Sequence, residues 1–248
     1  MSDPALPQSP STTVDTSFDR ERERIHRQML SSVSHDLKTP LASIIGSLEV
    51  FTRMHEQLSP EKRTTLISVA LQEAYRLDAF ISNILDMARL ENSAVKSKQE
   101  SVEIGPLLRN CLTRMENYMR GATINILPMG GEIVTMTDAV LFSRAIGLVL
   151  DNAVKYGGKP PMITVKFGEE SREWGYISIH DNGSGIPESQ IENIFSKYTR
   201  FAREDQQNAG TGLGLAIARE ILRLLQGRIT AANHPDGGAV FTLHFPIR

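Results

Sequence analysis

The chain has a single cysteine, Cys111, among its 248 residues. An intramolecular disulfide framework and a thiolate-rich zinc site are therefore both excluded. Aromatic residues are scarce at 6%, and neither sign of charge is in excess, with 27 Lys and Arg against 29 Asp and Glu. The formal net charge of -2 creates no general attraction to nucleic acid or to an anionic membrane surface, so we expect no nucleic-acid partner.

Long apolar runs are also missing: no stretch approaches the roughly 18 to 20 apolar residues that a membrane-spanning helix needs. The N-terminal segment MSDPALPQSPSTTVD lacks the basic and then apolar order of a signal peptide, and we expect a disordered leader over residues 1–20. We therefore expect no membrane contact from this chain. It would be cytoplasmic, as a soluble protein or as the cytosolic part of a membrane sensor.

Apolar residues recur at three- and four-residue spacing in two segments, which predicts two amphipathic helices. Ser59 is expected to cap the second helix and Pro60 to begin it. Two long helices with a short turn predict an antiparallel hairpin over residues 21–93. One hairpin cannot bury both apolar stripes, so we expect a homodimeric four-helix bundle. The stripes are Ile25, Met29, Val33, Leu37, Ile44, Leu48 and Phe51, and then Leu66, Val69, Leu77, Phe80, Ile84, Met87 and Leu90.

Short strands and helices alternate after a polar linker at residues 94–103. We expect helices over residues 104–120, from a cap at Asp138 to about Tyr156, and over 188–195 and 211–225. The segments INIL, EIVTM, MITVKF, YISIHD, RITAAN and AVFTLHF are expected to be strands. This order predicts an α+β sandwich over residues 104–248, with helices on one face of a mixed sheet.

The segment SHDLKTPL carries the first candidate chemistry. Helix geometry places Thr39 one turn after His35, with Asp36 adjacent. Pro40 lacks an N–H group, so we expect a bend there. A carboxylate that accepts from Nδ1–H leaves the Nε2 lone pair of an imidazole available as a nucleophile. Taken alone, the His-Asp pair also fits an ordinary surface histidine.

The segment DNAVKYG ends a predicted helix. Asn152 offers a hard oxygen of the kind that Mg²⁺ prefers. Lys155 and Tyr156 follow three and four residues later, within reach of a phosphate chain. The alternative is a plain helix C-terminus closed by Gly157.

The segment DNGSGIP follows a predicted strand. Gly183 and Gly185 permit positive φ and close approach of a planar ligand to the backbone. Asp181, buried at the strand end, can accept a hydrogen bond from an exocyclic amine such as that of adenine. An ordinary turn is the alternative.

The segment GTGLGLAIARE opens a predicted helix with small residues. These leave backbone N–H groups that suit phosphate oxygens. No strand leads directly into it, so it is not a dinucleotide-binding fingerprint. A Walker A motif is also excluded, because Lys159 is followed by Pro160 rather than Ser or Thr.

Together, in this order and spacing, the segments resemble the bacterial sensor histidine kinases of two-component systems, from Arg24 to the C-terminus. SHDLKTPL is similar to the H box, DNAVKYG to the N box, DNGSGIP to the G1 box, IFSKYTRF to the F box and GTGLGLAI to the G2 box. LDMARLE is similar to the KdpD-type potassium-sensor kinases. The resemblance implies a HisKA dimerisation hairpin followed by a HATPase_c domain of the GHKL or Bergerat type.

The resemblance also implies residue roles. His35 would be phosphorylated through Nε2, Asp36 would orient it, and Thr39 would hold a water for the reverse, phosphatase reaction. Asn152 would bind Mg²⁺. The implied ATP-binding residues are Asn152, Lys155, Tyr156, Asp181, Gly183, Gly185, Arg200, Gly210, Gly212, Leu213 and Gly214.

The implied function is ATP-dependent autophosphorylation on His35, followed by transfer to an Asp of a response-regulator receiver domain. Leu148 departs from the family, which often has a further Asn at that position, and Asn208 and Ala209 replace a common basic residue. These departures favour the alternative of a nucleotide-silent dimeric scaffold. An ATP-driven machine of the gyrase or chaperone kind is a third possibility, but such a machine has no use for the H box.

Overall fold

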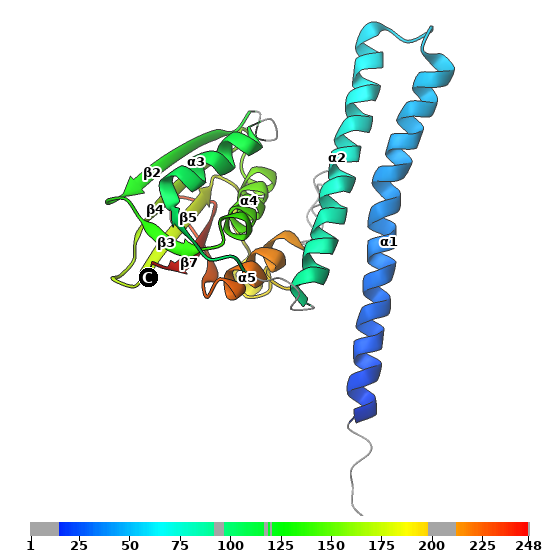
Figure 1. The fold of residues 1–248 in the computed structure, drawn as a ribbon. Helices are drawn as coiled ribbons and strands as arrows, with labels where there is room; N and C mark the ends of the chain where they lie inside the picture. The colour runs from blue at the N-terminus through cyan, green and yellow to red at the C-terminus, as the bar shows by residue number, and fades with distance from the viewer. Residues whose placement is uncertain (1–14, 92–96, 117–118, 120, 198–211, 248) are drawn as a thin grey trace, which may run out of the picture. The chain divides into compact units, whose positions relative to one another are not determined.

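The computed structural model describes residues 15–91, 97–116, 119, 121–197 and 212–247. Within residues 15–35, it describes the side chains of residues 33 and 34 only. The chain divides into two compact units, Met1–Phe80 and Ile81–Arg248 (Figure 1). No helix in the described ranges is both long and apolar enough to cross a membrane.

The first unit contains the predicted hairpin, formed by α1 (Asp15–Met54) and the first part of α2 (Pro60–Glu91). The second helix begins at Pro60 as predicted, because the Ser59 hydroxyl accepts a hydrogen bond from the Lys62 N–H at 3.4 Å. A side-chain hydrogen bond from Ser59 also lowers the pKa of Glu61. Helix α1 continues through Pro40, and the bend expected there stays a prediction.

Large apolar side chains remain exposed along both helices of the hairpin. Leu48 is 48% exposed and Leu71 is 51% exposed. Two helices alone therefore leave an exposed apolar stripe on the hairpin. Among the described side chains of the predicted stripes, only Leu48 belongs to it, and the others are buried or half-buried. The exposed set in this unit also includes Leu41, Ile45, Val50, Met54, Ile67 and Tyr75.

The second unit is built on a five-stranded mixed sheet of order β2-β4-β5-β7-β6. Strand β2 pairs with β4 in parallel, and the remaining neighbours are antiparallel. The strands are β2 (Thr123–Met129), β4 (Met162–Glu169), β5 (Trp174–Asp181), β6 (Arg228–Asn233) and β7 (Ala239–Pro246).

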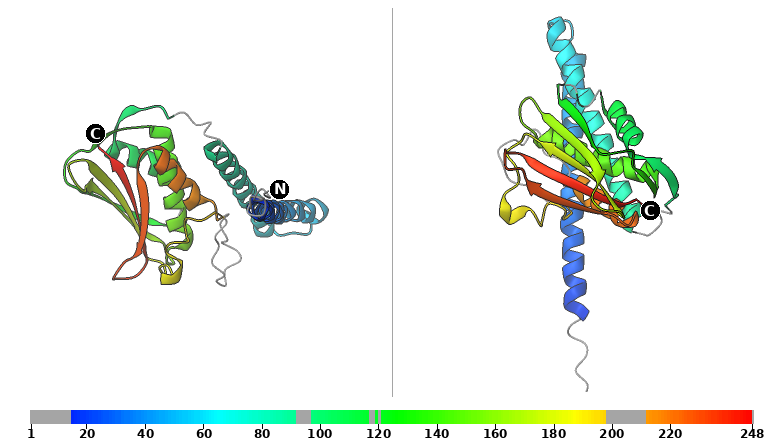
Figure 2. Two further views of the ribbon diagram at one scale, coloured as in Figure 1. Left: turned by 90° about the horizontal axis from the view of Figure 1, so that it is seen from below. Right: turned by 90° about the vertical axis from the view of Figure 1, so that its left-hand side faces the viewer.

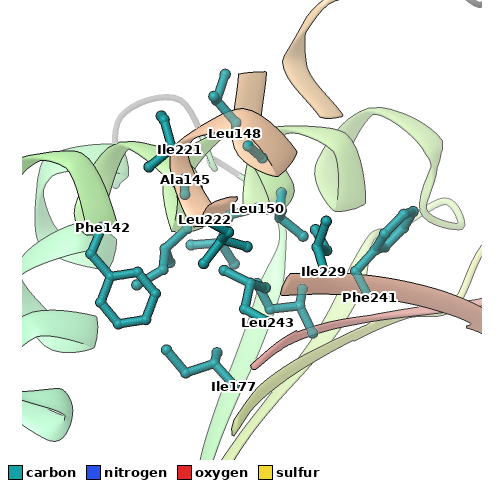
Figure 3. Close-up of a cluster of buried hydrophobic side chains, with 14 of the residues drawn as sticks. Phe142, Ala145, Leu148, Leu150, Ile177, Ile221, Leu222, Ile229, Phe241 and Leu243 are labelled. Carbon is teal, nitrogen blue, oxygen red and sulfur yellow. The ribbon is translucent and has the colours of Figure 1, made fainter. Parts of the chain in front are cut away.

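Helices α3 (Ile104–Met115), α4 (Ala139–Tyr156) and α5 (Gly214–Leu224) cover one face of this sheet (Figures 1 and 2). Alternate residues of β5 are buried, as expected for a sheet with one covered face. The core joins residues of α4 and α5 to the covered face, including Phe142, Leu222 and Leu243 (Figure 3). This is the predicted sandwich.

Some elements differ from the sequence-based expectation. Residues Glu100–Glu103, placed in the predicted linker, form strand β1, which pairs with β3 (Val134–Thr137). Only Val102 of β1 is buried, so the strand carries almost no apolar alternation and depends on its partner. Where a helix was expected over residues 188–195, there is only a short 3₁₀ turn, η1 (Glu188–Gln190), followed by turns. Helix α3 ends at Met115 rather than near residue 120.

Candidate functional site

Asp181, the last residue of β5, is a carboxylate buried to 2% exposure. Its Oδ1 accepts hydrogen bonds from the backbone N–H of Gly183 at 2.8 Å and of Ala239 at 3.2 Å. Its side chain makes no other hydrogen bond to a described residue, so Oδ2 has no partner there. Burial raises the pKa of Asp181, and the two backbone donors only partly oppose that shift. The site therefore contains a largely buried carboxylate, one of whose oxygens can still accept a hydrogen bond.

The loop after β5 is bound to the loop after α4. The Asn182 Oδ1 accepts from Gly158 N–H at 2.9 Å and Met162 N–H at 2.8 Å, and its Nδ2 donates to the Pro160 carbonyl at 3.1 Å. At Gly183, a Cβ would collide with the Tyr156 carbonyl. These contacts hold the C-terminal end of α4 against the loop that follows Asp181.

The last turns of α4 present Asn152, Lys155 and Tyr156. Lys155 is paired with Asp151, with Nζ 2.6 Å from Oδ2, so its contact with a phosphate chain stays a prediction. The side chain of the partly exposed Asn152 makes no hydrogen bond to any described residue. A free amide oxygen fits Mg²⁺, which uses few protein ligands and retains water and phosphate oxygens. Tyr156 is exposed.

Helices α4 and α5 differ in the capping of their N-termini. Asp138 caps α4 as predicted, accepting from Val140 N–H and Leu141 N–H at 3.0 Å. The residue before α5 is Leu213, and no described side chain caps that helix. An uncapped first turn leaves N–H groups that suit an anion such as phosphate. Gly212, with a φ of 68°, makes the left-handed turn into this helix.

The start of α5 lies against α4. A Cβ on Gly214 would be 3.7 Å from the Leu148 Cδ2, and Leu148 is one turn before Asn152. Leu148 is buried and packs in the core, so it supplies no ligand atom. The structure thus brings together three of the predicted segments: the end of α4, the loop after Asp181 and the start of α5.

The remaining predicted site residues lie outside the described ranges, in α1 or in the loop after Asp181. Arg200 and Gly210 lie outside the described residues, as does the side chain of His35. The backbone of His35 is in α1, and Thr39, one turn further on, is exposed. Asp36 is partly buried. Gly185 has a φ of 74°. This is the positive φ that a glycine was expected to permit at this position.

Two asparagines that hold the site were not identified as such from the sequence. Asn182 belongs to the motif DNGSGIP, but its bonds to residues 158–162 have no local signal. Asn233 lies in a predicted strand, and its side chain bonds the backbone of Ile186. Both contacts join segments that are distant in the sequence.

A mixed sheet with helices on one face, a buried carboxylate at the end of β5 and a helix start that no described side chain caps are the features expected of an ATP-binding domain. Residues 137–248 match the family model described as "Histidine kinase-, DNA gyrase B-, and HSP90-like ATPase". Residues 25–93 match the "His Kinase A (phospho-acceptor) domain". The chain therefore belongs to the family of histidine kinases.

Curated relatives carry matching names. The sensor protein KdpD of Escherichia coli (strain K12) is 34% identical over 229 residues, which are 91% of this chain and 25% of the relative. The sensor histidine kinase YvrG of Bacillus subtilis (strain 168) is 30% identical over 231 residues, which are 91% of this chain and 40% of the relative. The chain thus spans between a quarter and two fifths of the length of these relatives.

Solved structures share the fold. Histidine kinase ThkA, in its complex with response regulator protein TrrA, superposes with a TM-score of 0.68 at 22% identity, covering 96% of this chain and 68% of that one. Acinetobacter baumannii histidine kinase AdeS gives 0.64 at 19% identity, covering 86% of this chain and 98% of that one. The predicted helical hairpin followed by an α+β ATP-binding domain is confirmed.

Proposed function

We propose that this chain phosphorylates itself on His35 from ATP and then passes the phosphoryl group to an aspartate of a response-regulator receiver domain. Asp181 is the observation that supports this most. It is a buried carboxylate with one oxygen left without a described partner. The domain that contains it follows a phospho-acceptor domain in the same chain.

The nucleotide would be held from both ends. Asp181 would accept a hydrogen bond from the adenine amino group, with Gly183 and Gly185 beside the ring. The start of α5, which no described side chain caps, would donate backbone N–H groups to the phosphates. Mg²⁺ held by Asn152 would neutralise phosphate charge. The further proposed phosphate and lid contacts are Lys155, Tyr156, Arg200, Gly210, Gly212, Leu213 and Gly214.

The phosphoryl transfer requires mainly positioning and charge stabilisation. The Nε2 lone pair of His35 attacks the γ-phosphorus, and the bond to the β,γ-bridging oxygen breaks, with its electron pair leaving on ADP. Asp36 accepts the Nδ1–H hydrogen bond and stabilises the cationic ring that forms. A carboxylate oxygen of the regulator then attacks phosphorus, the N–P bond breaks, and the imidazole of His35 is regenerated.

The reverse activity would be hydrolysis of the regulator's phosphoaspartate. The Thr39 hydroxyl would hold a water that attacks phosphorus and releases inorganic phosphate. Thr39 is exposed on the same helix as His35, one turn away.

The hairpin would act as a homodimer. Its exposed apolar side chains have the helical spacing of a bundle interior. A second copy of the hairpin would cover them and complete four helices.

The test is a labelling assay with γ-³²P-ATP and Mg²⁺. The chain should gain a label that is labile in acid and stable in base. His35→Gln should abolish it, whereas His55→Gln, an exposed histidine in the turn of the same hairpin, should retain it. Label that persists in His35→Gln would contradict the assignment of the phosphorylated residue.

The packing of Leu148 favours a second candidate, a dimeric scaffold that binds no nucleotide. A buried leucine stands one turn before Asn152, where the family often has a further amide. Such a scaffold would show no rise in melting temperature with ADP and Mg²⁺. A rise would exclude it.

A further inference from the structure

Asn233, the last residue of β6, bonds to both backbone groups of Ile186. Its Oδ1 accepts from the Ile186 N–H at 2.7 Å, and its Nδ2 donates to the Ile186 carbonyl at 2.7 Å. A side-chain amide that bonds to both the N–H and the carbonyl of one residue makes the same pair of hydrogen bonds as a neighbouring β-strand would. It fixes the position and the orientation of that residue together.

The clamped residue ends the loop that carries the expected adenine contacts. Gly185, directly before Ile186, has a φ of 74°, and a Cβ there would be 2.7 Å from the Asn233 Oδ1. The Asn233 side chain therefore packs directly against the left-handed backbone of Gly185. Asn182 and the Gly183 N–H fix the start of the loop, and Asn233 fixes its end at Ile186.

The segment after Asn233 contacts Asp181 and the residue before it. Ala239 N–H donates to the Asp181 Oδ1 at 3.2 Å. The neighbouring His180 Nε2 is 2.9 Å from the Gly237 carbonyl. The β6–β7 hairpin thus contacts both the carboxylate and the loop, and Asn233 makes the loop contact.

We propose that Asn233 is a positioning residue for nucleotide binding, which holds residues 182–187 in the conformation that accepts adenine. The inference rests on the proposed function. Without the clamp, the binding-competent conformation becomes a smaller fraction of the population, and the apparent Kd rises in proportion. Phosphoryl transfer from bound nucleotide does not involve Asn233.

The test is Asn233→Ala in the full chain, with ADP and Mg²⁺ as the probe. We expect the Kd for ADP to rise about tenfold, which is about 1.4 kcal/mol, with little change in the melting temperature without nucleotide. In the labelling assay, KM for ATP should rise while the rate at saturating ATP is unchanged. Asn125→Ala is the matched control, an exposed asparagine on β2 at the opposite edge of the same sheet.

A second variant removes only half of the clamp. Asn233→Asp keeps the acceptor for Ile186 N–H but places a carboxylate oxygen against the Ile186 carbonyl, so the Kd for ADP should rise at least as much as in Asn233→Ala. Asn233→Ser, whose hydroxyl can accept from the N–H or donate to the carbonyl, should recover part of the affinity.

An unchanged Kd in a folded Asn233→Ala would overturn the positioning role while leaving the proposed function in place. Unfolding of both the Ala and Asp variants would also overturn it, because Asn233 would then support the sheet rather than the loop. If the wild-type chain did not bind ADP, the proposed function and this inference would fail together.

Discussion

The two units bury their apolar side chains to very different extents. In the first unit, Ile45 and Leu48 are nearly half exposed, whereas in the second unit Leu150 and Ile217 are fully buried. A sheet with three helices on one face encloses a core by itself, but two helices can cover only one side of each apolar stripe. The second unit therefore encloses its own core, whereas the first leaves exposed apolar side chains that the second copy of the proposed dimer would cover.

The sharpest test of this difference is a charge placed on the exposed stripe. Ile45→Lys should raise the dimer dissociation constant at least about 100-fold, because an unpaired ammonium would be buried between helices. Sedimentation velocity would measure it. Gln57→Lys, in the exposed turn, adds the same charge and should leave the dimer intact. A dimer that survives Ile45→Lys would show that the stripe is not its interface.

Equal truncations in the two units should have unequal effects. Leu150→Ala removes a fully buried side chain and should lower the free energy of unfolding of the second unit by about 2–5 kcal/mol. Leu48→Ala should leave that unfolding transition unchanged. Urea denaturation followed by fluorescence of Trp174 would measure both. An equal loss in the two variants would contradict the independence of the second unit's core.

Asp181 is one of two buried carboxylates among the described residues of the second unit, with Asp138, and its effect on stability depends on pH. Burial raises the pKa of Asp181 in the folded state. Between the ordinary aspartate pKa and this raised pKa, the folded chain holds a proton that the unfolded chain has released. Stability from this group should fall as pH rises from the ordinary aspartate pKa through the raised one. Asp181→Asn should therefore raise the melting temperature at neutral pH, and it should abolish stabilisation by ADP.

Thermal melting with and without ADP would measure both effects of Asp181→Asn. Asp78→Asn, an exposed residue of α2, should change neither. A lower melting temperature for Asp181→Asn at neutral pH would show that the charge of Asp181 stabilises the unit.

The smallest expected effect concerns the end of α2, which belongs to the second unit. Arg144 Nε is 2.9 Å from the Asp86 Oδ2, and its Nη2 donates to the Asn83 Oδ1 at 2.8 Å. Both ion-pair partners are partly exposed, so Arg144→Met should lower stability by about 1 kcal/mol or less. Faster hydrogen exchange in residues 83–91 would report the loss. Arg223→Met, which breaks the pair with Glu220 within α5, should not change that exchange.

Local signals were sufficient for most elements. The cap at Asp138, the start at Pro60 and the alternation of β5 each involve residues close in sequence, and each was predicted. Strand β1 was missed because its hydrogen-bonding partner is β3, more than thirty residues away. For the candidate site, the sequence indicated Asn152 and Asp181 from their motifs, but not what each contacts.

The sequence by itself determined the order of the segments and the chemical groups they carry, including the histidine in a helix and the carboxylate at a strand end. Only the tertiary structure decided which of these groups meet. Ile186 and Asn233 are separated by 47 positions, and Asp181 and Ala239 by 58. Such contacts depend on the pairing and register of whole strands, because a shift of one residue would turn each side chain to the other face of the sheet.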